Sequence, residues 1–165
     1  MTFNAEASAP SAPGDKGLER RARLTNAIDS LVKLRQEVVV SYCQLAGVSS
    51  FANRNVEEHS VEGDRLRRFC QIMVDYTAMG HFEVYQRIIE GKERRRTVKE
   101  AAAEVYPGIA ETTDYLIDFN DKYDGFEKLE GDVVGTMLAG DLSKLGEMIA
   151  IRGELEDQIL TALSK

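Results

Sequence analysis

The chain has 165 residues, of which 43% are hydrophobic and 30% are charged, a composition typical of one soluble globular domain. Its 28 acidic and 21 basic side chains leave a net charge of −7, which argues against nucleic acid or a membrane as partner and permits a basic protein partner. No apolar run approaches the ~20 residues of a membrane span, and no signal peptide is visible. We therefore expect a cytoplasmic protein.

The N-terminal segment, residues 1–17, is small, polar and interrupted by Pro10, Pro13 and Gly14. Such a segment cannot bury enough apolar surface to offset the entropy of ordering. We expect a disordered tail over residues 1–17 and a single domain over residues 18–165.

The first predicted helix begins after this tail. Apolar residues recur at spacings of three and four from Leu24 to Leu45, which is typical of an amphipathic helix, and Gly47 is expected to end it. Arg35 lies on the same apolar stripe. The next segment, 47–60, is rich in Gly, Ser and Asn and predicts a loop.

The most apolar predicted helix spans residues 61–90. At about 100° per residue, one stripe contains Leu66, Cys70, Met73, Val74, Thr77, Val84, Tyr85 and Ile88. Ala78, Phe82 and Ile89 widen this stripe, so we expect the helix to contact neighbours on more than one side. His81 falls in the middle of the arc and is expected to be buried and hydrogen-bonded.

The basic run GKERRR follows this helix at Gly91–Arg96. We interpret it as a solvated loop between helices, with a phosphate contact as the alternative. A short helix is predicted over residues 97–105, before Tyr106-Pro107-Gly108 breaks it.

A third long helix is predicted from Ile109 to Tyr123, with Asp114, Asp118 and Asp121 turned outward. The segment from Gly125 to Gly140 is rich in glycine, and its middle could hold one or two helical turns over 132–138. Asp141 is a suitable N-cap for the last helix, whose inner stripe is Leu142, Leu145, Ile149, Arg152, Glu156, Ile159 and Leu163.

The pattern as a whole contains four principal amphipathic helices, short extra helices and no strand-like segment of useful length. Moderate loops between long helices favour antiparallel neighbours. The predicted fold is therefore all-α, an antiparallel up-and-down helix bundle.

Several polar side chains fall on the predicted inner stripes, namely Arg35, His81, Thr113, Asn120, Arg152 and Glu156. Because arginine is rarely buried unpaired, we expect a connected network in which Asp75 and Glu156 offset Arg35 and Arg152. One interpretation is that this network only fixes helix register. The alternative is a small-anion or phosphoryl-sensing bundle, in which Arg35, His81 and Arg152 line a polar cavity.

Catalytic and metal chemistry find little support in the sequence. The chain has two histidines, and His59 falls in a predicted loop, so a zinc site is not expected. A histidine phosphotransfer domain would need an exposed histidine, whereas His81 lies on the apolar arc. Cys43 and Cys70 both lie on apolar stripes and are predicted to be buried. We expect no enzyme activity, no metal and no cofactor.

Four sequence blocks extend the interpretation beyond these physical arguments. The segments Leu31–Gly47, Phe69–Arg87, Glu111–Asp124 and Leu142–Gln158 carry the patterns LxxxRQExxVxYxxLAG, FCQxxVDYxxxGHFxVYxR, ETTxxxxDFNDKYD and LSxLGExxAxRxxLEDQ. Together these blocks resemble the Rsd/AlgQ family of bacterial regulators of the primary sigma factor of RNA polymerase, also called anti-sigma factors.

The resemblance implies an all-α fold and binding to domain 4 of the primary sigma factor, which carries the helix-turn-helix that reads the −35 promoter element. Masking this domain would block its promoter contact and its docking on the polymerase, so that alternative sigma factors gain access to the core enzyme. We expect no direct contact with nucleic acid, no membrane contact, and a monomer or weak homodimer.

The motif positions that match the family are candidates for partner contact or for the inner network, without a division between the two: Arg35, Asp75, Tyr76, His81, Tyr85, Asn120, Asp121, Glu147, Arg152 and Glu156. A surface that binds DNA phosphates is basic, and an acidic helical protein can occupy it in place of DNA. The outward carboxylates of Asp114, Asp118 and Asp121 are therefore predicted to form an acidic contact face.

Overall fold

The structure, a computed structural model, describes residues 13–46, 56–124 and 132–164. Its long helices are α1 (Pro13–Ala46), α2 (Val56–Met79), α3 (Arg96–Tyr123) and α4 (Asp132–Leu163). Two π-helical segments, η2 (Gly80–Tyr85) and η3 (Ile88–Lys92), continue the line of α2.

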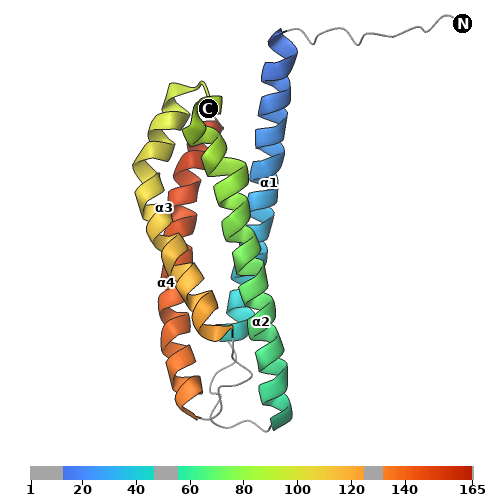
Figure 1. Cartoon of the computed structure of the whole chain (residues 1–165), viewed down its shortest axis with the longest axis vertical. Coiled ribbons are helices and arrows are strands. Elements are labelled where there is room, and N and C mark those ends of the chain that lie inside the picture. The colour runs from blue at the N-terminus through green and yellow to red at the C-terminus, as the bar shows by residue number, and fades with distance from the viewer. Residues whose placement is uncertain (1–12, 47–55, 125–131, 165) are drawn as a thin grey trace, which may run out of the picture.

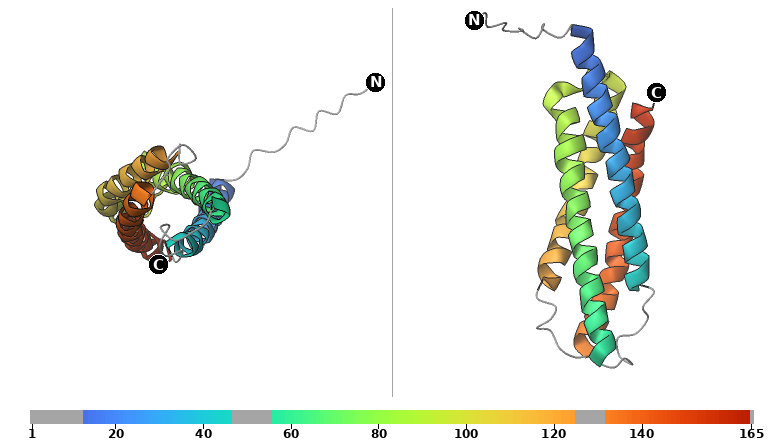
Figure 2. Two further views of the ribbon diagram at one scale, coloured as in Figure 1. Left: turned by 90° about the horizontal axis from the view of Figure 1, so that it is seen from below. Right: turned by 90° about the vertical axis from the view of Figure 1, so that its right-hand side faces the viewer.

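The four helices run alternately up and down around one core (Figures 1 and 2). α1 packs mainly on α2 and α3 mainly on α4, and the N-terminal part of α1 extends beyond the end of the bundle (Figure 1). The described residues contain no strand. The predicted all-α antiparallel bundle is confirmed. None of the described helices has the combination of length and apolar character that a membrane crossing demands.

The core forms because each helix buries a stripe with spacings of three and four. On α2 the buried stripe runs through Leu66, Phe69, Met73 and Tyr76. The Phe69 ring meets the Phe119 ring of α3 edge to face, with 6.2 Å between ring centroids, an arrangement that adds to the stability gained from area burial alone.

The two cysteines differ in environment. Cys70 is buried as predicted, and burial is the main reason why the pKa of its thiol rises to about 12. Such a thiol is inert at neutral pH. Cys43 is exposed, so its predicted burial is wrong, because the buried stripe of α1 runs through Leu31, Val38 and Leu45 and leaves Cys43 on the solvent side.

Two predicted helix starts are corrected by the structure. α1 begins at Pro13, so the last five residues of the predicted tail are helical; proline suits the first turn because its missing N–H has no partner there anyway. The rest of that tail lies outside the described residues. α2 begins at Val56 rather than near residue 61.

The predicted break at Pro107 is also wrong. α3 continues through Pro107, whose ring is exposed and whose missing N–H costs one backbone bond without stopping the helix. Figure 1 shows α3 bowed around α4. Gly108 allows the close approach, since a Cβ there would lie 2.8 Å from a methyl carbon of Leu155.

The last helix starts nine residues earlier than expected. The segment 132–138, for which one or two turns are predicted, is part of a continuous α4. Asp141 therefore lies within the helix and is not its N-cap. Its carboxylate instead accepts hydrogen bonds from Lys122, at 2.6 Å, and from the Tyr123 hydroxyl, which tie α4 to the end of α3.

A tyrosine of α1 fixes the spacing between α1 and α4. The Tyr42 hydroxyl donates to the backbone carbonyl of Leu142 at 2.7 Å. It passes so close to Gly146 that a Cβ there would overlap the hydroxyl oxygen. Only glycine leaves room for this contact, which gives the LGE block a structural role.

We predict that Gly146→Ala destabilises the bundle by about 1–3 kcal/mol, because Tyr42 must leave its site. A Cβ at Gly140, on the same helix, would have no neighbouring side chain within 4 Å, so Gly140→Ala should stabilise by up to about 1 kcal/mol through helix propensity. Urea unfolding of both variants measures the difference. A Gly146→Ala variant at least as stable as Gly140→Ala would contradict the packing described.

Candidate functional site

The centre of the bundle holds a fully buried arginine, Arg152 of α4. Its Nη1 donates to the hydroxyl of Thr113 at 2.6 Å, to that of Thr112 at 3.1 Å and to the carbonyl of Ile109 at 3.3 Å. All three acceptors belong to α3. The predicted inner position of Arg152 is confirmed, and the residue joins α4 to α3.

The other side of the Arg152 guanidinium faces two aromatic rings. Its carbon lies 5.3 Å from the ring centroid of Tyr76 and 5.9 Å from that of Tyr85, distances that suit cation–π attraction. Nε and Nη2 have no hydrogen-bond acceptor among the described residues. The rings are thus the main contacts that compensate this side of the buried charge.

Glu156, one helical turn after Arg152, accepts hydrogen bonds from the hydroxyls of Tyr76 and Tyr85. Burial is the first cause of a raised pKa at Glu156, opposed by the charges of Arg152 and Arg35 and by the two tyrosine hydrogen bonds. Burial and the nearby Glu156 raise the pKa values of both tyrosines, so both hydroxyls remain protonated donors. This pairing joins α4 to α2 and η2.

Arg35 of α1 lies at the solvent-facing edge of this group of side chains. Its Nη1 lies 2.9 Å from a carboxylate oxygen of Asp157 and 3.8 Å from one of Glu156. The Arg35 side chain is 22% exposed, so it is half-buried. Arg35, Tyr76, Tyr85, Arg152 and Glu156 therefore form one connected group, which we call the inner layer.

The alternative of an inner anion cavity does not fit this geometry. Arg35 and Arg152 are bonded to protein groups, and His81 is exposed on the outside of the bundle. His81 therefore does not share the interior with Arg152.

The exposure of His81 contradicts its predicted burial. Tyr85 and Ile88 follow His81 by four and seven residues, so a straight α-helix would place all three on one face. η2 replaces one α-turn with a wider π-turn, which shifts the phase by about one residue. Gly80, Tyr85 and Ile88 consequently face the core, while His81 turns outward and packs edge-on against Phe82, with 4.8 Å between ring centroids.

Asp75 is exposed and accepts a hydrogen bond from Gln71 at 3.0 Å. The expectation that it offsets a buried arginine is wrong; the hydroxyls of Thr112 and Thr113 and the carboxylate of Asp157 take that role. Glu147 is exposed beside Lys144, and Asn120 is half-buried. These residues lie apart from the inner layer.

An apolar groove of about 350 Å³ lies on the outside of the bundle, between α2, with its continuation η2, and α3. It is lined by Met73, Val74, Thr77, Ala78, His81, Phe82, Thr113, Leu116 and Ile117. Three of these apolar side chains are exposed, Phe82 to 60%, Ile117 to 45% and Val74 to 37%. Exposed apolar residues that gather beside a groove mark an interaction surface more often than isolated ones do.

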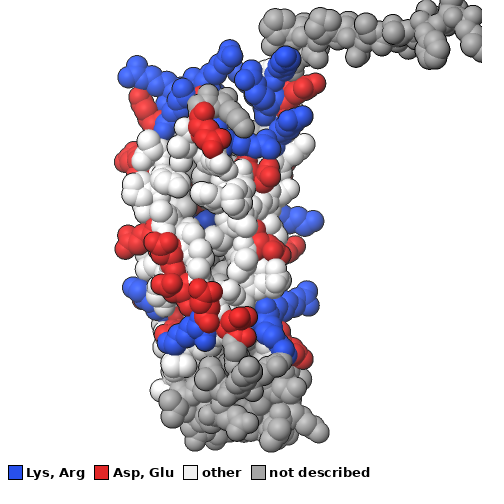
Figure 3. Space-filling view, viewed as in Figure 1, with Lys and Arg blue, Asp and Glu red and all other residues white. Residues whose placement is uncertain are grey.

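Acidic side chains border this groove. Asp114, Asp118 and Asp121 are all exposed on α3, as predicted, and their spacing places them on one stripe with Ile117. Asp75 of α2 is also exposed. Figure 3 shows the same face, where an uncharged area over α2 and α3 adjoins a run of acidic side chains.

Thr113 links the groove to the inner layer. It lines the groove, and its hydroxyl accepts the 2.6 Å hydrogen bond from Arg152. The buried arginine thus holds one wall of the groove in place from behind.

Sequence reasoning missed several of these residues. Asp157 and Thr112 are not among the candidate site residues, although in the sequence Asp157 follows Glu156 and Thr112 precedes Thr113. The groove residues Phe82 and Ala78 had a usable signal, since they widen the apolar arc of the second helix beyond what a four-helix bundle covers. The prediction that this helix contacts more than one neighbour is confirmed by its packing on α1 and α3, yet Phe82 remains uncovered.

We predict that Arg152→Ala destabilises the protein by roughly 3–5 kcal/mol, because it removes the positive charge that does most to offset the burial of the Glu156 carboxylate. Arg96, whose side chain is 90% exposed in an ion pair with Glu100 one turn away, is the matched control and should cost about 0.3–0.5 kcal/mol when replaced by alanine. Denaturant unfolding compares the two. Equal midpoints would mean that the inner layer contributes nothing to stability.

Comparison with known proteins places this architecture in a family. Residues 15–164 match the family described as "Regulator of RNA polymerase sigma(70) subunit, Rsd/AlgQ". A regulator of sigma D from Yersinia pseudotuberculosis serotype O:1b is 33% identical over 135 residues, which are 81% of this chain and 76% of the relative. The regulator of sigma D from Shigella boydii serotype 4 is 27% identical over 154 residues, 87% of each chain. No solved structure matches significantly.

These matches confirm the resemblance inferred from the four sequence blocks and the expectation of a regulator that is not an enzyme. The chain belongs to the Rsd/AlgQ family of regulators of the sigma(70) subunit of RNA polymerase.

Proposed function

We propose that this protein is a cytoplasmic anti-sigma regulator that binds domain 4 of the primary sigma factor through the groove between α2 and α3. Binding there masks the surfaces of domain 4 that read the −35 element and dock on the polymerase, so that transcription shifts toward alternative sigma factors. The observation that carries the proposal is the uncovered apolar groove beside an acidic stripe, in a chain that belongs to a family of sigma(70) regulators.

The groove has the make-up of an interface core. Phe82, Ile117 and Val74 are exposed in the free protein, and a partner helix laid along the groove would remove them from water. Burial of apolar area of this kind supplies the main attraction in helix-in-groove recognition. In this proposal the outer half of the apolar arc on α2 and η2 contacts the partner, which explains why that arc is wider than the core of the bundle requires.

The acidic border suits the chemistry of the proposed partner. A domain that binds DNA phosphates has a basic surface, and Asp114, Asp118 and Asp121 present carboxylates beside Ile117 on the same stripe of α3. Opposite charges at the rim accelerate the encounter, while the apolar centre slows dissociation. The protein acts as a monomer in this proposal, and it makes no direct contact with DNA.

We expect Asp114→Lys with Asp118→Lys to slow association with immobilised domain 4 by about tenfold at low salt, as measured by surface plasmon resonance. Wild-type association should also slow as salt rises from roughly 50 to 200 mM, since the Debye length falls from about 14 to 7 Å. Phe82→Ala and Ile117→Ala should instead raise the dissociation rate, each by about fivefold or more.

Matched controls lie on other faces of the bundle. Asp29→Lys with Glu154→Lys makes the same change in net charge on α1 and α4, where both residues are exposed. Ile151 of α4 is 42% exposed, so Ile151→Ala matches Ile117→Ala. Absence of wild-type binding at micromolar concentration would refute the function, whereas equal effects of test and control variants would refute the choice of face.

A further inference from the structure

A second recess lies at the end of the bundle where α1 extends past its neighbours. It has a volume of about 560 Å³ and is formed by α1 and the segment from Arg87 to Arg95, well away from the groove between α2 and α3. Its charged lining consists of the six arginines Arg20, Arg21, Arg23, Arg87, Arg94 and Arg95 and one carboxylate, that of Glu93. We call it the arginine recess.

The distribution of partners within the recess leaves positive charge uncompensated. The carboxylate of Glu93 accepts from Nε of Arg95 at 2.7 Å and from its backbone N–H at 3.0 Å. The hydrogen bond from Arg95 is the main cause of a lowered pKa at Glu93, so this one carboxylate is ionised and already occupied. Arg87 pairs outside the recess lining, with Glu83 at 2.9 Å.

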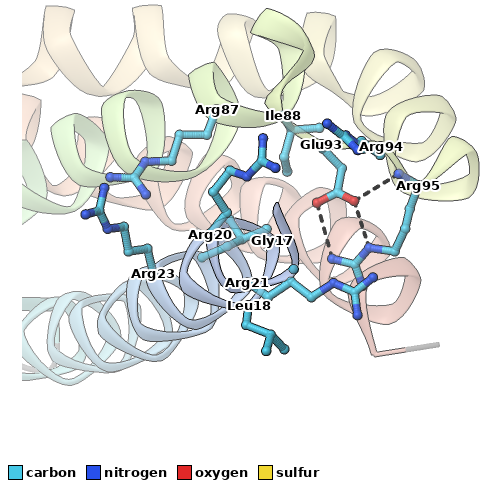
Figure 4. A pocket seen from close by; sticks show the side chains of 12 residues that line it. Gly17, Leu18, Arg20, Arg21, Arg23, Arg87, Ile88, Glu93, Arg94 and Arg95 are labelled. Atoms are coloured by element: carbon cyan, nitrogen blue, oxygen red, sulfur yellow. Dashed lines mark hydrogen bonds and ion pairs between the residues drawn. The ribbon is translucent and has the colours of Figure 1, made fainter. Parts of the chain in front are cut away.

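Four arginines of the recess have no ion-pair partner among the described residues. Arg20 donates only to the carbonyl of Lys16, at 3.2 Å, and Arg21, Arg23 and Arg94 form no hydrogen bond or ion pair with any described residue. Figure 4 shows the α1 arginines projecting toward the segment that carries Arg87, Glu93, Arg94 and Arg95. In a chain of net charge −7, this concentration of guanidinium groups without ion-pair partners creates a local positive potential that attracts anions.

Two features suit a compact polyanion such as an oligophosphate. The charged donors are arginines throughout, and the planar guanidinium fork binds phosphate oxygens, like carboxylate oxygens, through two parallel hydrogen bonds; adjacent phosphoryl groups place several such oxygens within reach of neighbouring arginines. The volume lies within the range of small-molecule sites, and the recess also contains the apolar side chains of Leu24 and Ile88. The anchoring of Arg95 to the carbonyl of Leu163 at 3.1 Å fixes one wall against the end of α4.

From this geometry we propose that the arginine recess binds a small anion with two or more adjacent phosphoryl groups, such as an inorganic polyphosphate or a nucleoside polyphosphate. Residues 93–95 of the basic run are then part of a phosphate site and not merely a solvated loop. This site is independent of the groove, so a bound anion and a protein partner can occupy the molecule together.

Isothermal titration calorimetry of the full chain at constant ionic strength tests the proposal, with tripolyphosphate, ATP, orthophosphate, sulfate and a hexaglutamate peptide as separate probes. We expect tripolyphosphate and ATP to bind with a dissociation constant below about 100 μM and at least tenfold more tightly than orthophosphate or sulfate, since adjacent phosphoryl groups engage several guanidinium groups at once. Tighter binding of ATP than of tripolyphosphate identifies a nucleoside polyphosphate; equal binding identifies the phosphate chain alone.

The test variant is Arg21→Gln with Arg94→Gln, which removes two exposed and unpaired charges. Its control, Arg65→Gln with Arg68→Gln, removes two exposed charges from α2, roughly 30 Å along the helix from Arg87. We expect the test variant to lose tenfold or more in tripolyphosphate affinity and the control to stay within twofold, with unchanged thermal unfolding of both. Equal losses in the two variants, no binding by the wild type at millimolar concentration, or hexaglutamate binding as tightly as tripolyphosphate would overturn the proposal.

Discussion

The burial of one guanidinium group constrains most of this structure. A charge removed from water is very costly unless its surroundings replace the lost hydration. Around Arg152 that replacement requires the hydroxyls of Thr112 and Thr113 from α3 and the rings of Tyr76 and Tyr85 from α2 and η2. Since these groups meet only when the helices have one particular register, the polar contacts select that register among the several that apolar packing alone would allow.

The same constraint reaches the surface through Thr113, which lies between Arg152 and the groove. A rigid wall is useful to a binding protein because less conformational entropy is lost when the partner docks. The family blocks can be understood on this basis. Leu145 of the LGE block and Glu156 of the LED block lie in the interior, while the residues proposed to meet the partner lie on α2, η2 and α3.

The sequence was sufficient to predict the helical bundle and the inner positions of Arg152 and Glu156, because their apolar neighbours recur at regular helical spacing. It was not sufficient for His81, since a π-turn changes the phase and periodicity assumes a constant 100° per residue. Pro107 and Asp141 were misread for a related reason. Local helix-ending and capping preferences are weak, and tertiary contacts with α4 and α3 override them.

The outer surface was less predictable than the core. The acidic stripe of Asp114, Asp118 and Asp121 followed from helix phase, but Phe82 and Val74 looked like core residues, because a sequence does not distinguish apolar side chains that the fold covers from those left for a partner. The net charge of −7 likewise conceals a basic recess at one end of the bundle (Figure 4). The distribution of charged side chains over the surface, and not the net charge alone, therefore has to be known before a partner is inferred.

The most direct test of the proposed interface is a backbone NMR titration of the isotope-labelled protein with unlabelled domain 4 of the primary sigma factor. The account predicts that the largest changes in chemical shift fall on Val74, His81, Phe82, Ile117 and Asp118, with little change at Asp29 and Glu154 on the other helices. Changes concentrated on the face formed by α1 and α4, with the groove residues unaffected, would contradict it.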